Sequence, residues 1–376
     1  MLSRLVLQNF RNLSALSQTL GPKFNWITGP NGSGKTAFLE ALYFLSHGRS
    51  FRSAQWQKLI QNNTNYFSIF CEFNADSPIN QIGLYRTSAG EVKLKQDEVL
   101  LPSHVSLTKS LPCLLINPEL YDEFWEGSRP RRSLIDWGLF YQSPEFYTLW
   151  QTYTRALKQR NAALKTSPKL NKLNKLNKLN KLNSTESDLI TLWDEILEKT
   201  ADQINILRKN YCSDLFNLLA PEIILAFPNL TIDFSYTRGW PEELSLKQAL
   251  TEHLVQDQQL GYTFYGPHRA DLKIKIKIKK NDHPTGMISL NAHEYLSRGQ
   301  QKKLITLIKL TQGELLEKNT GLFCLYLLDD LASELDITNQ NFLFSKLDSR
   351  ASQVFITALE RPDYANNATH QEIKLN

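Results

Sequence analysis

Apolar and polar positions follow different periods in different parts of the chain. Near the start, the loose alternation over residues 1–10 and the apolar run at 24–28 predict two strands, with a helix over 35–46. In the middle, apolar residues recur at helical spacing and predict two amphipathic helices, over 146–164 and 189–218. The pattern therefore predicts a helical hairpin or arm that interrupts an α/β protein.

The last third of the chain returns to mixed strands and helices. Residues 272–280 alternate strictly between leucine or isoleucine and lysine, which predicts a strand with one apolar and one basic face. After residue 357 about twenty residues remain, and no further strand is expected there. The remaining predicted strands span 66–73, 81–86, 91–101, 111–116, 322–328 and 353–357, and the remaining helices span 298–318 and 339–347.

The composition is that of an ordinary globular protein, with 41% hydrophobic and 22% charged residues. No apolar run approaches the roughly 18 residues that a membrane span needs, so no membrane contact is expected. The first residues lack the apolar segment of a signal peptide, which predicts a cytoplasmic protein. The four cysteines form no CxxC pair, which disfavours a zinc ribbon or a disulfide scaffold.

The net charge of +5 depends on one unusual segment. Residues 169–183 repeat Lys-Leu-Asn five times, and without these five lysines the net charge is zero. The repeat is either a tolerated low-complexity insertion or a basic finger that touches DNA. The lysines at 273, 275, 277 and 279 likewise form either a solvated strand face or a phosphate-contacting stripe. The overall charge therefore says little about partners.

A phosphate-binding P-loop follows the predicted strand at 24–28 and precedes the predicted helix. Glycines let backbone N–H groups curl around phosphates, and the helix N-terminus favours an anion. The lysine should reach the β- and γ-phosphates of ATP, and the following threonine should bind Mg²⁺. The motif GxxxxGK[ST] is formed by Gly29, Pro30, Asn31, Gly32, Ser33, Gly34, Lys35 and Thr36.

Two further motifs suit a P-loop ATPase. The apolar strand at 322–328 ends in Asp329, expected to hold Mg²⁺, and Asp330, expected to orient or deprotonate the attacking water. Ser297 begins the long helix as an N-cap, with Gln300 three residues on. The segment 296–301 also resembles the LSGGQ-type signature of ABC ATPases, which implies that Ser297 and Gly299 cover the γ-phosphate held by a second subunit.

Together these motifs resemble the RecF family of bacterial recombination and repair ATPases, related to SMC and Rad50 heads. The KLN tract departs from that pattern. The resemblance rests on Leu7–Asn12, Gly29–Thr36, Asn117–Glu119, Arg131–Gly138, Lys158–Asn161, Gly266–Leu272, Leu296–Gln301 and Leu327–Asp336.

The resemblance implies an ABC-type P-loop ATPase head with an inserted, mostly helical lobe. Lobe I would combine residues 1–140 and 262–376, and lobe II would span 141–261 with the KLN insertion at 169–183. ATP with Mg²⁺ would join two heads into a homodimer on single-stranded or gapped duplex DNA, and slow, weakly DNA-stimulated hydrolysis would release it. RecO and RecR are the implied partners, with roles in recombinase loading, replication-fork maintenance and SOS induction. The alternative is an SMC-like or other ABC-type ATPase with a cargo other than DNA.

Several residues keep two interpretations. Arg11 and Asn12 either approach the nucleotide, as in related heads, or form a surface turn. Thr357 is either a phosphate sensor or an ordinary strand-end threonine. His268 is either catalytic or, with Arg269, part of a structural or DNA-facing pair. The arginines at 129, 131 and 132 are expected to lie on the solvated face of a helix start.

Overall fold

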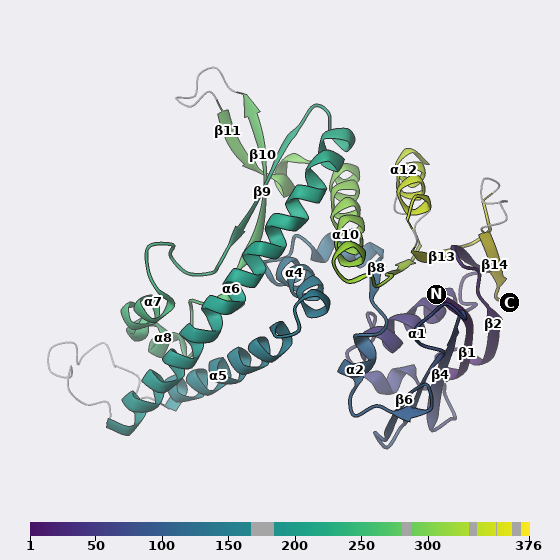
Figure 1. The fold of residues 1–376 in the computed structure, drawn as a ribbon, viewed down its shortest axis with the longest axis horizontal. Coiled ribbons are helices and arrows are strands. Elements are labelled where there is room, and N and C mark those ends of the chain that lie inside the picture. Colours follow the sequence, from purple (N-terminus) through teal and green to yellow (C-terminus); the bar gives the residue numbers. More distant parts are fainter. Residues whose placement is uncertain (167–183, 280–286, 331–336, 351, 363–369) are drawn as a thin grey trace. The chain divides into compact units, whose positions relative to one another are not determined.

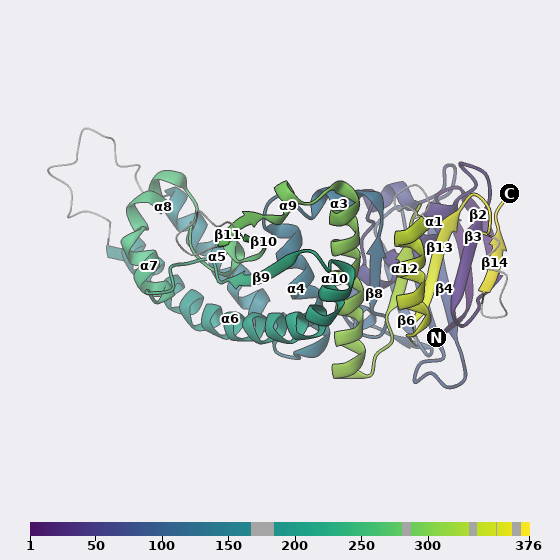
Figure 2. The same ribbon diagram turned by 90° about the horizontal axis from the view of Figure 1, so that it is seen from above.

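The computed structural model describes residues 1–166, 184–279, 287–330, 337–350, 352–362 and 370–376, and its helices and strands are drawn in Figures 1 and 2. The chain forms two compact units. Unit 1 combines residues 1–122 with 297–376, and unit 2 spans 123–296.

Unit 1 contains an antiparallel sheet whose buried residues alternate along the strands. In β1, Leu2, Leu5, Leu7 and Phe10 are buried and the polar residues between them are less covered. The strands, in spatial order, are β2 (Leu13–Thr19), β1 (Leu2–Phe10), β4 (Tyr66–Phe73), β5 (Gln81–Thr87), β6 (Val92–Gln96) and β7 (Val99–Leu100).

The second sheet of unit 1 is parallel, and its inner strands are nearly continuous apolar runs, as expected for strands covered on both faces. Helix α1 (Lys35–His47) contacts both sheets and buries Phe38, Leu42 and Leu45 in their shared core. Helices α10 (Arg298–Thr320) and α12 (Ile337–Asp348) contact each other and lie side by side in Figure 2. The strand order is β14 (His370–Lys374), β3 (Phe24–Thr28), β13 (Gln353–Ala358), β12 (Leu325–Leu328) and β8 (Cys113–Ile116). Unit 1 also contains the short helices η1 (Trp56–Leu59), α2 (His104–Thr108) and the start of α3 (Pro118–Glu123).

Unit 2 is built around the 43-residue helix α6 (Ser184–Ala226), which packs along α5 (Phe146–Thr166) and contacts α4 (Arg129–Gln142). It also holds a three-stranded antiparallel sheet in the order β11, β10, β9. Its other elements are β9 (Thr231–Thr237), α7 (Leu246–Glu252), α8 (Leu254–Leu260), η3 (Pro267–Arg269), β10 (Asp271–Lys279), β11 (Met287–Asn291) and α9 (Ala292–Tyr295).

The units have different boundaries from the expected lobes. Lobe II was expected to span 141–261, whereas unit 2 spans 123–296. Helix α4 contacts both α6 and β10, and β10 pairs along its length with β9, so these elements belong to the same unit as the helical arm. Unit 2 is therefore helix and sheet together. Apolar periodicity along single segments does not reveal such pairings between distant segments.

Two predictions about strands were wrong. Residues 370–374 form β14, which pairs in parallel with β3, although no strand was expected after 357. Only Ile373 of this strand is buried, so its sequence carries almost no apolar signal. The single strand expected over 91–101 is instead the hairpin β6–β7, which turns at Asp97 and Glu98, both with positive φ.

No helix among the described residues is both long and apolar enough to cross a membrane. The KLN tract at 169–183 and the last part of the Leu327–Asp336 motif, residues 331–336, lie outside the described residues.

Candidate nucleotide-binding site

The loop between β3 and α1 has a backbone that only glycine accommodates at key points. Gly29 has φ +148°, and a Cβ there would collide with the Leu375 carbonyl oxygen. Gly34 has φ +104°, and a Cβ there would lie 2.6 Å from a methyl group of Leu13. The glycines therefore let the loop pass between neighbouring segments while its central residues, 30–32, remain exposed.

Lys35 curls back over this loop. Its Nζ donates to the carbonyl oxygens of Gly29 at 2.7 Å and Pro30 at 2.9 Å. The hydroxyl of Ser33 is buried without a hydrogen-bond partner among the described residues. The loop thus presents an ammonium group that neutral carbonyls hold, with no carboxylate partner among the residues the structure describes, and an unsatisfied hydroxyl, beside the N-terminus of α1. This arrangement suits an anion.

Asp329 follows β12 and is held by two threonine hydroxyls. Thr36 donates to its Oδ1 at 3.1 Å, and Thr357 donates to the same oxygen at 2.8 Å. The parallel pairing of β12 with β13 brings Asp329 and Thr357 to the same edge of the sheet. The structure therefore brings together the P-loop threonine and the strand-end aspartate, which lie 293 positions apart in the sequence.

Burial raises the pKa of Asp329, and the two hydroxyl hydrogen bonds partly offset this effect. The nearby negative charges of Asp330 and Glu119 raise the pKa further. The carboxylate therefore sits where the charged form is disfavoured, and a cation would relieve this cost. Asp330 itself has φ +51°, and its N–H donates to the Thr357 hydroxyl at 2.8 Å.

Thr357 thus contacts both acids of the strand end. Neither interpretation of the sequence, a phosphate sensor or an ordinary strand-end threonine, included this contact. Asn117 and Glu119 were likewise given no role, although the Asn117 amide donates to the Glu119 carboxylate at 2.6 Å. The sequence feature that could have indicated a role is Asn-Pro-Glu directly after the apolar run of β8. Because β8 and β12 are parallel neighbours, these residues lie at the same sheet edge as Asp329.

Ser297 is the N-cap of α10 and forms a reciprocal capping box with Gln300. Its Oγ accepts from the Gln300 N–H at 3.3 Å, and the Gln300 side chain accepts from the Ser297 N–H at 3.0 Å. Residues 297–300 are exposed, and a Cβ placed on Gly299 would meet no atom within 4 Å. The hydrogen bonds of Ser297 are local, and none joins it to the P-loop among the described residues.

The turn after β1 contacts the P-loop through Asn12. Arg11 has φ +55°, and its guanidinium forms an ion pair with the fully buried Glu40, at 2.6 and 2.8 Å. The Asn12 amide donates to the carbonyl of Gly32 at 2.8 Å. Arg11 therefore anchors the turn on α1, and Asn12 is the residue of this turn that contacts the loop.

The basic motif residues of unit 2 have internal partners. Arg131 forms a two-point ion pair with Asp271 at 2.9 and 3.1 Å, and Arg132 donates to the Ala270 carbonyl at 2.7 Å. The expectation of a solvated helix face is wrong for these two arginines, although Arg129 is exposed. Lys277 pairs with Asp233 at 3.0 Å.

His268 is part of the packing of unit 2. Its Nδ1 is 2.6 Å from the Tyr153 hydroxyl and its Nε2 is 3.0 Å from the Thr263 carbonyl. Burial lowers the pKa of His268 to about 4, so the imidazole is neutral at pH 7. Both ring nitrogens are thus occupied, which supports the structural interpretation over the catalytic one.

The chain matches the RecF/RecN/SMC N terminal domain over residues 1–375. The DNA replication and repair protein RecF of Vibrio vulnificus (strain CMCP6) is 37% identical over 360 residues, 95% of this chain and 92% of that protein. The RecF protein of Shewanella pealeana is 35% identical over 96% of this chain and 92% of its own length. The chain belongs to the RecF family.

Solved structures agree with membership of the RecF family. A RecF–ATPrS structure, described as a recombination mediator of the RecFOR pathway, has a TM-score of 0.79 and 25% identity, and covers all of this chain and 96% of its own. A RecF–ATP structure has a TM-score of 0.78 and 27% identity over 96% and 92% of the two chains. An Smc head from Pyrococcus furiosus, with a TM-score of 0.51 and 15% identity over 96% and 89%, shares the fold. The fold is that of an ABC-type ATPase head.

Proposed function

We propose that this chain is an ATP-dependent DNA-binding protein of recombinational repair and replication-fork maintenance. ATP and Mg²⁺ would join two copies on single-stranded or gapped duplex DNA, and slow hydrolysis would reset the complex. The observation that carries the proposal is the contact of Thr36 and Asp329 behind an exposed P-loop. The names of the relatives, DNA replication and repair proteins, supply the biological context.

The residues present fit ATP with Mg²⁺. The unsatisfied Ser33 hydroxyl and the Lys35 ammonium suit the phosphates. Among the described residues no group of three or more His, Cys, Asp or Glu could hold a metal ion. Thr36 and Asp329 would therefore supply only part of a coordination shell, as is usual for Mg²⁺ at a triphosphate. Bound Mg²⁺ would neutralise charge on the transferring phosphate.

Asp330 would orient or deprotonate the water that attacks the γ-phosphate. Its backbone N–H donates to the Thr357 hydroxyl, which in turn donates to the Asp329 carboxylate. This shared partner fixes the positions of Asp329 and the Asp330 backbone relative to each other. Positioning of the water together with charge stabilisation is what phosphoryl transfer requires from a protein. Arg11 would act through the turn that it anchors, since its guanidinium is paired with Glu40.

Ser297 and Gly299 would complete the site of a second copy. The segment is exposed, Gly299 is open to solvent, and the positive end of the α10 helix dipole favours an anion. One chain would thus supply the P-loop and its partner the helix N-terminus, so dimerisation would depend on ATP. The solved relatives are described as recombination mediators of the RecFOR pathway, which supports RecO and RecR as partners. Recombinase loading and SOS induction would be the downstream roles.

Sedimentation velocity tests the proposal. The purified chain is run without nucleotide, with ATP and Mg²⁺, and with both plus a gapped duplex. We expect a monomer, then a dimer, then a dimer that carries DNA. ATP-dependent dimers that never bind DNA would favour an ABC-type ATPase with another cargo. Monomers under all conditions would contradict the clamp.

A further inference from the structure

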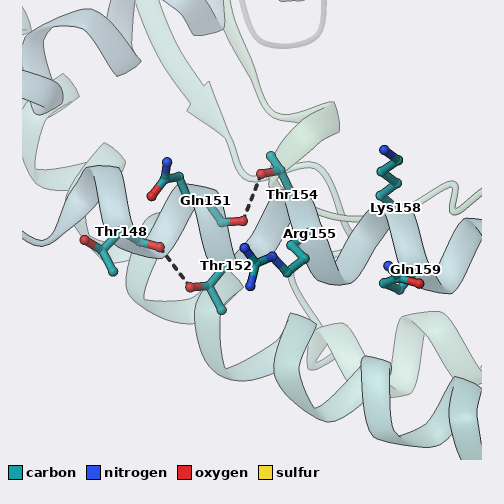
Figure 3. Close-up of a pocket in the computed structure, with 7 residues that line it drawn as sticks. All are labelled: Thr148, Gln151, Thr152, Thr154, Arg155, Lys158 and Gln159. Carbon is teal, nitrogen blue, oxygen red and sulfur yellow. Dashed lines mark hydrogen bonds between the residues drawn. The ribbon is translucent and has the colours of Figure 1, made fainter. Parts of the chain in front are cut away.

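Helix α5 presents an exposed face without carboxylates. Its exposed positions include Thr148, Gln151, Thr152, Arg155, Lys158 and Gln159, which also line a hollow on the surface of unit 2 (Figure 3). None of the 21 residues of α5 is acidic. Glu145, just before the helix, is the nearest acid in the sequence.

The exposed face of α6 has a different composition, although α6 packs along α5. Its exposed residues mix acids with lysines, for example Glu195 and Asp202 with Lys199 and Lys209. Such a mixed surface is typical of a helix that faces water without a specific partner. The acid-free face of α5 is therefore a local feature and not a property of the whole unit.

The cations of this face are free. Neither Arg155 nor Lys158 forms an ion pair with a described residue, in contrast to the paired Arg131, Arg160 and Arg208 of the same unit. Two of the threonine hydroxyls are used within the helix: Thr152 donates to the Thr148 carbonyl at 2.9 Å and Thr154 to the Gln151 carbonyl at 3.1 Å (Figure 3). The Gln151 amide donates to the Tyr147 hydroxyl at 2.8 Å. The strongest donors available to a ligand are thus the guanidinium of Arg155 and the ammonium of Lys158.

No aromatic residue of α5 is fully exposed. Phe146 and Tyr153 are buried, Tyr147 and Trp150 are half-buried, and Trp150 stacks on Tyr153 with ring centroids 5.5 Å apart. A surface for unstacked bases needs exposed aromatic rings. Donor side chains without such rings suit phosphate oxygens instead, which fix a protein on nucleic acid without reading its sequence.

We infer that the exposed face of α5, with Arg155 and Lys158 at its centre, contacts the sugar-phosphate backbone of duplex DNA. This inference rests on the proposed DNA binding and names a surface for it. From Thr148 to Gln159 the helix rises about 16 Å, at 1.5 Å per residue. That length corresponds to roughly five base-pair steps of duplex axis, so the face would meet a few phosphates of one strand.

Charge reversal tests the surface. The variant Arg155→Glu/Lys158→Glu and the control Lys199→Glu/Lys209→Glu change the net charge equally and alter only exposed residues. Binding of a fluorescent 20-base-pair duplex is measured with ATP at several salt concentrations. We expect the α5 variant to bind at least about 10-fold more weakly and the magnitude of its log–log salt slope to fall by about 2, at roughly 0.9 per lost phosphate contact. The α6 control should keep the wild-type slope.

A milder variant, Arg155→Gln/Lys158→Gln, guards against a folding defect and should show the same loss of slope with a smaller loss of affinity. Circular dichroism confirms folding for each variant. If wild type binds duplex DNA and the α5 variants keep its slope, the surface lies elsewhere and the inference is overturned. Equal losses in the α5 and α6 variants would also overturn it, because they indicate a long-range charge effect. If wild type binds no DNA with ATP, the proposed function fails instead.

Discussion

The charged residues of the P-loop site and those in the interior of unit 2 have different kinds of partner. At the P-loop, Lys35 is held by backbone carbonyls and Asp329 by hydroxyls. In unit 2, Arg208 is fully buried and forms a two-point pair with Asp136 at 2.8 and 2.9 Å.

Arg160 is also fully buried, between Asp194 at 2.5 Å and Asp257 at 2.6 Å. A charge with weak, neutral partners is available to a ligand, whereas a charge paired inside the protein is structural. A basic residue in a motif is therefore informative about ligands only once its partner is known. The following predictions test this distinction, from the largest expected effect to the smallest.

Removal of Arg208 should mainly affect folding. Arg208→Ala removes a fully buried guanidinium and leaves the partly buried Asp136 carboxylate without its two-point partner, which should lower the free energy of unfolding by about 3 kcal/mol. The adjacent, exposed Lys209→Ala should change it by no more than about 0.5 kcal/mol. Urea unfolding of both variants measures the difference. A stability loss below about 1 kcal/mol for Arg208→Ala would show that this pair is not structural.

Lys35→Ala should affect ligand binding and spare the fold. Within the described part of the chain the ammonium donates to two loop carbonyls, but it would make charge-assisted contacts with phosphates. ATP affinity should fall on the order of 10²-fold, the scale of a lost charged hydrogen bond. Equilibrium dialysis compares it with the exposed-lysine control Lys109→Ala. Unchanged ATP binding would remove the P-loop assignment.

Asp330→Asn should separate ATP binding from hydrolysis. The substitution keeps size and hydrogen bonding but removes the negative charge and the basicity. ATP binding and dimerisation should persist, while single-turnover hydrolysis should slow by about 10²-fold or more, the scale of lost general-base catalysis. DNA complexes should last correspondingly longer. Hydrolysis near the wild-type rate would assign the water-activating role to another residue.

Thr357→Val should weaken the use of Mg²⁺. The Thr357 hydroxyl bond favours the charged form of Asp329, so its removal raises the pKa of this carboxyl further. The Mg²⁺ concentration for half-maximal ATP binding should rise about 2- to 10-fold, equivalent to one neutral hydrogen bond. The pH midpoint of that binding should also move upward. Thr357→Ser should restore both values, and an unchanged midpoint in Thr357→Val would show that the hydroxyl does not position Asp329.

The parts of the site that are formed by contiguous sequence motifs could be predicted from the sequence. The P-loop lies between a strand and a helix as expected, and the acidic strand end lies beside it, because parallel strands share one edge. Strand β14 was missed because its residues are mostly polar and it is stabilised by pairing with β3.

The arginine partners were missed for a related reason. Arg131 and Asp271 are 140 positions apart, and Arg208 and Asp136 are 72 apart. No local pattern signals such a pair, so exposure and ion pairing could be assigned only from the structure.

The central claim is that ATP is held between two copies, with Lys35 from one and Ser297 from the other. Steady-state ATP hydrolysis by Ser297→Arg, alone and mixed with Lys35→Ala, tests it most directly. Each variant alone should be nearly inactive, and the mixture should recover weak activity, because one composite site combines Lys35 of the first chain with Ser297 of the second. Hydrolysis at the wild-type rate by Ser297→Arg alone would mean that one chain forms a complete site, which would contradict the shared-site mechanism.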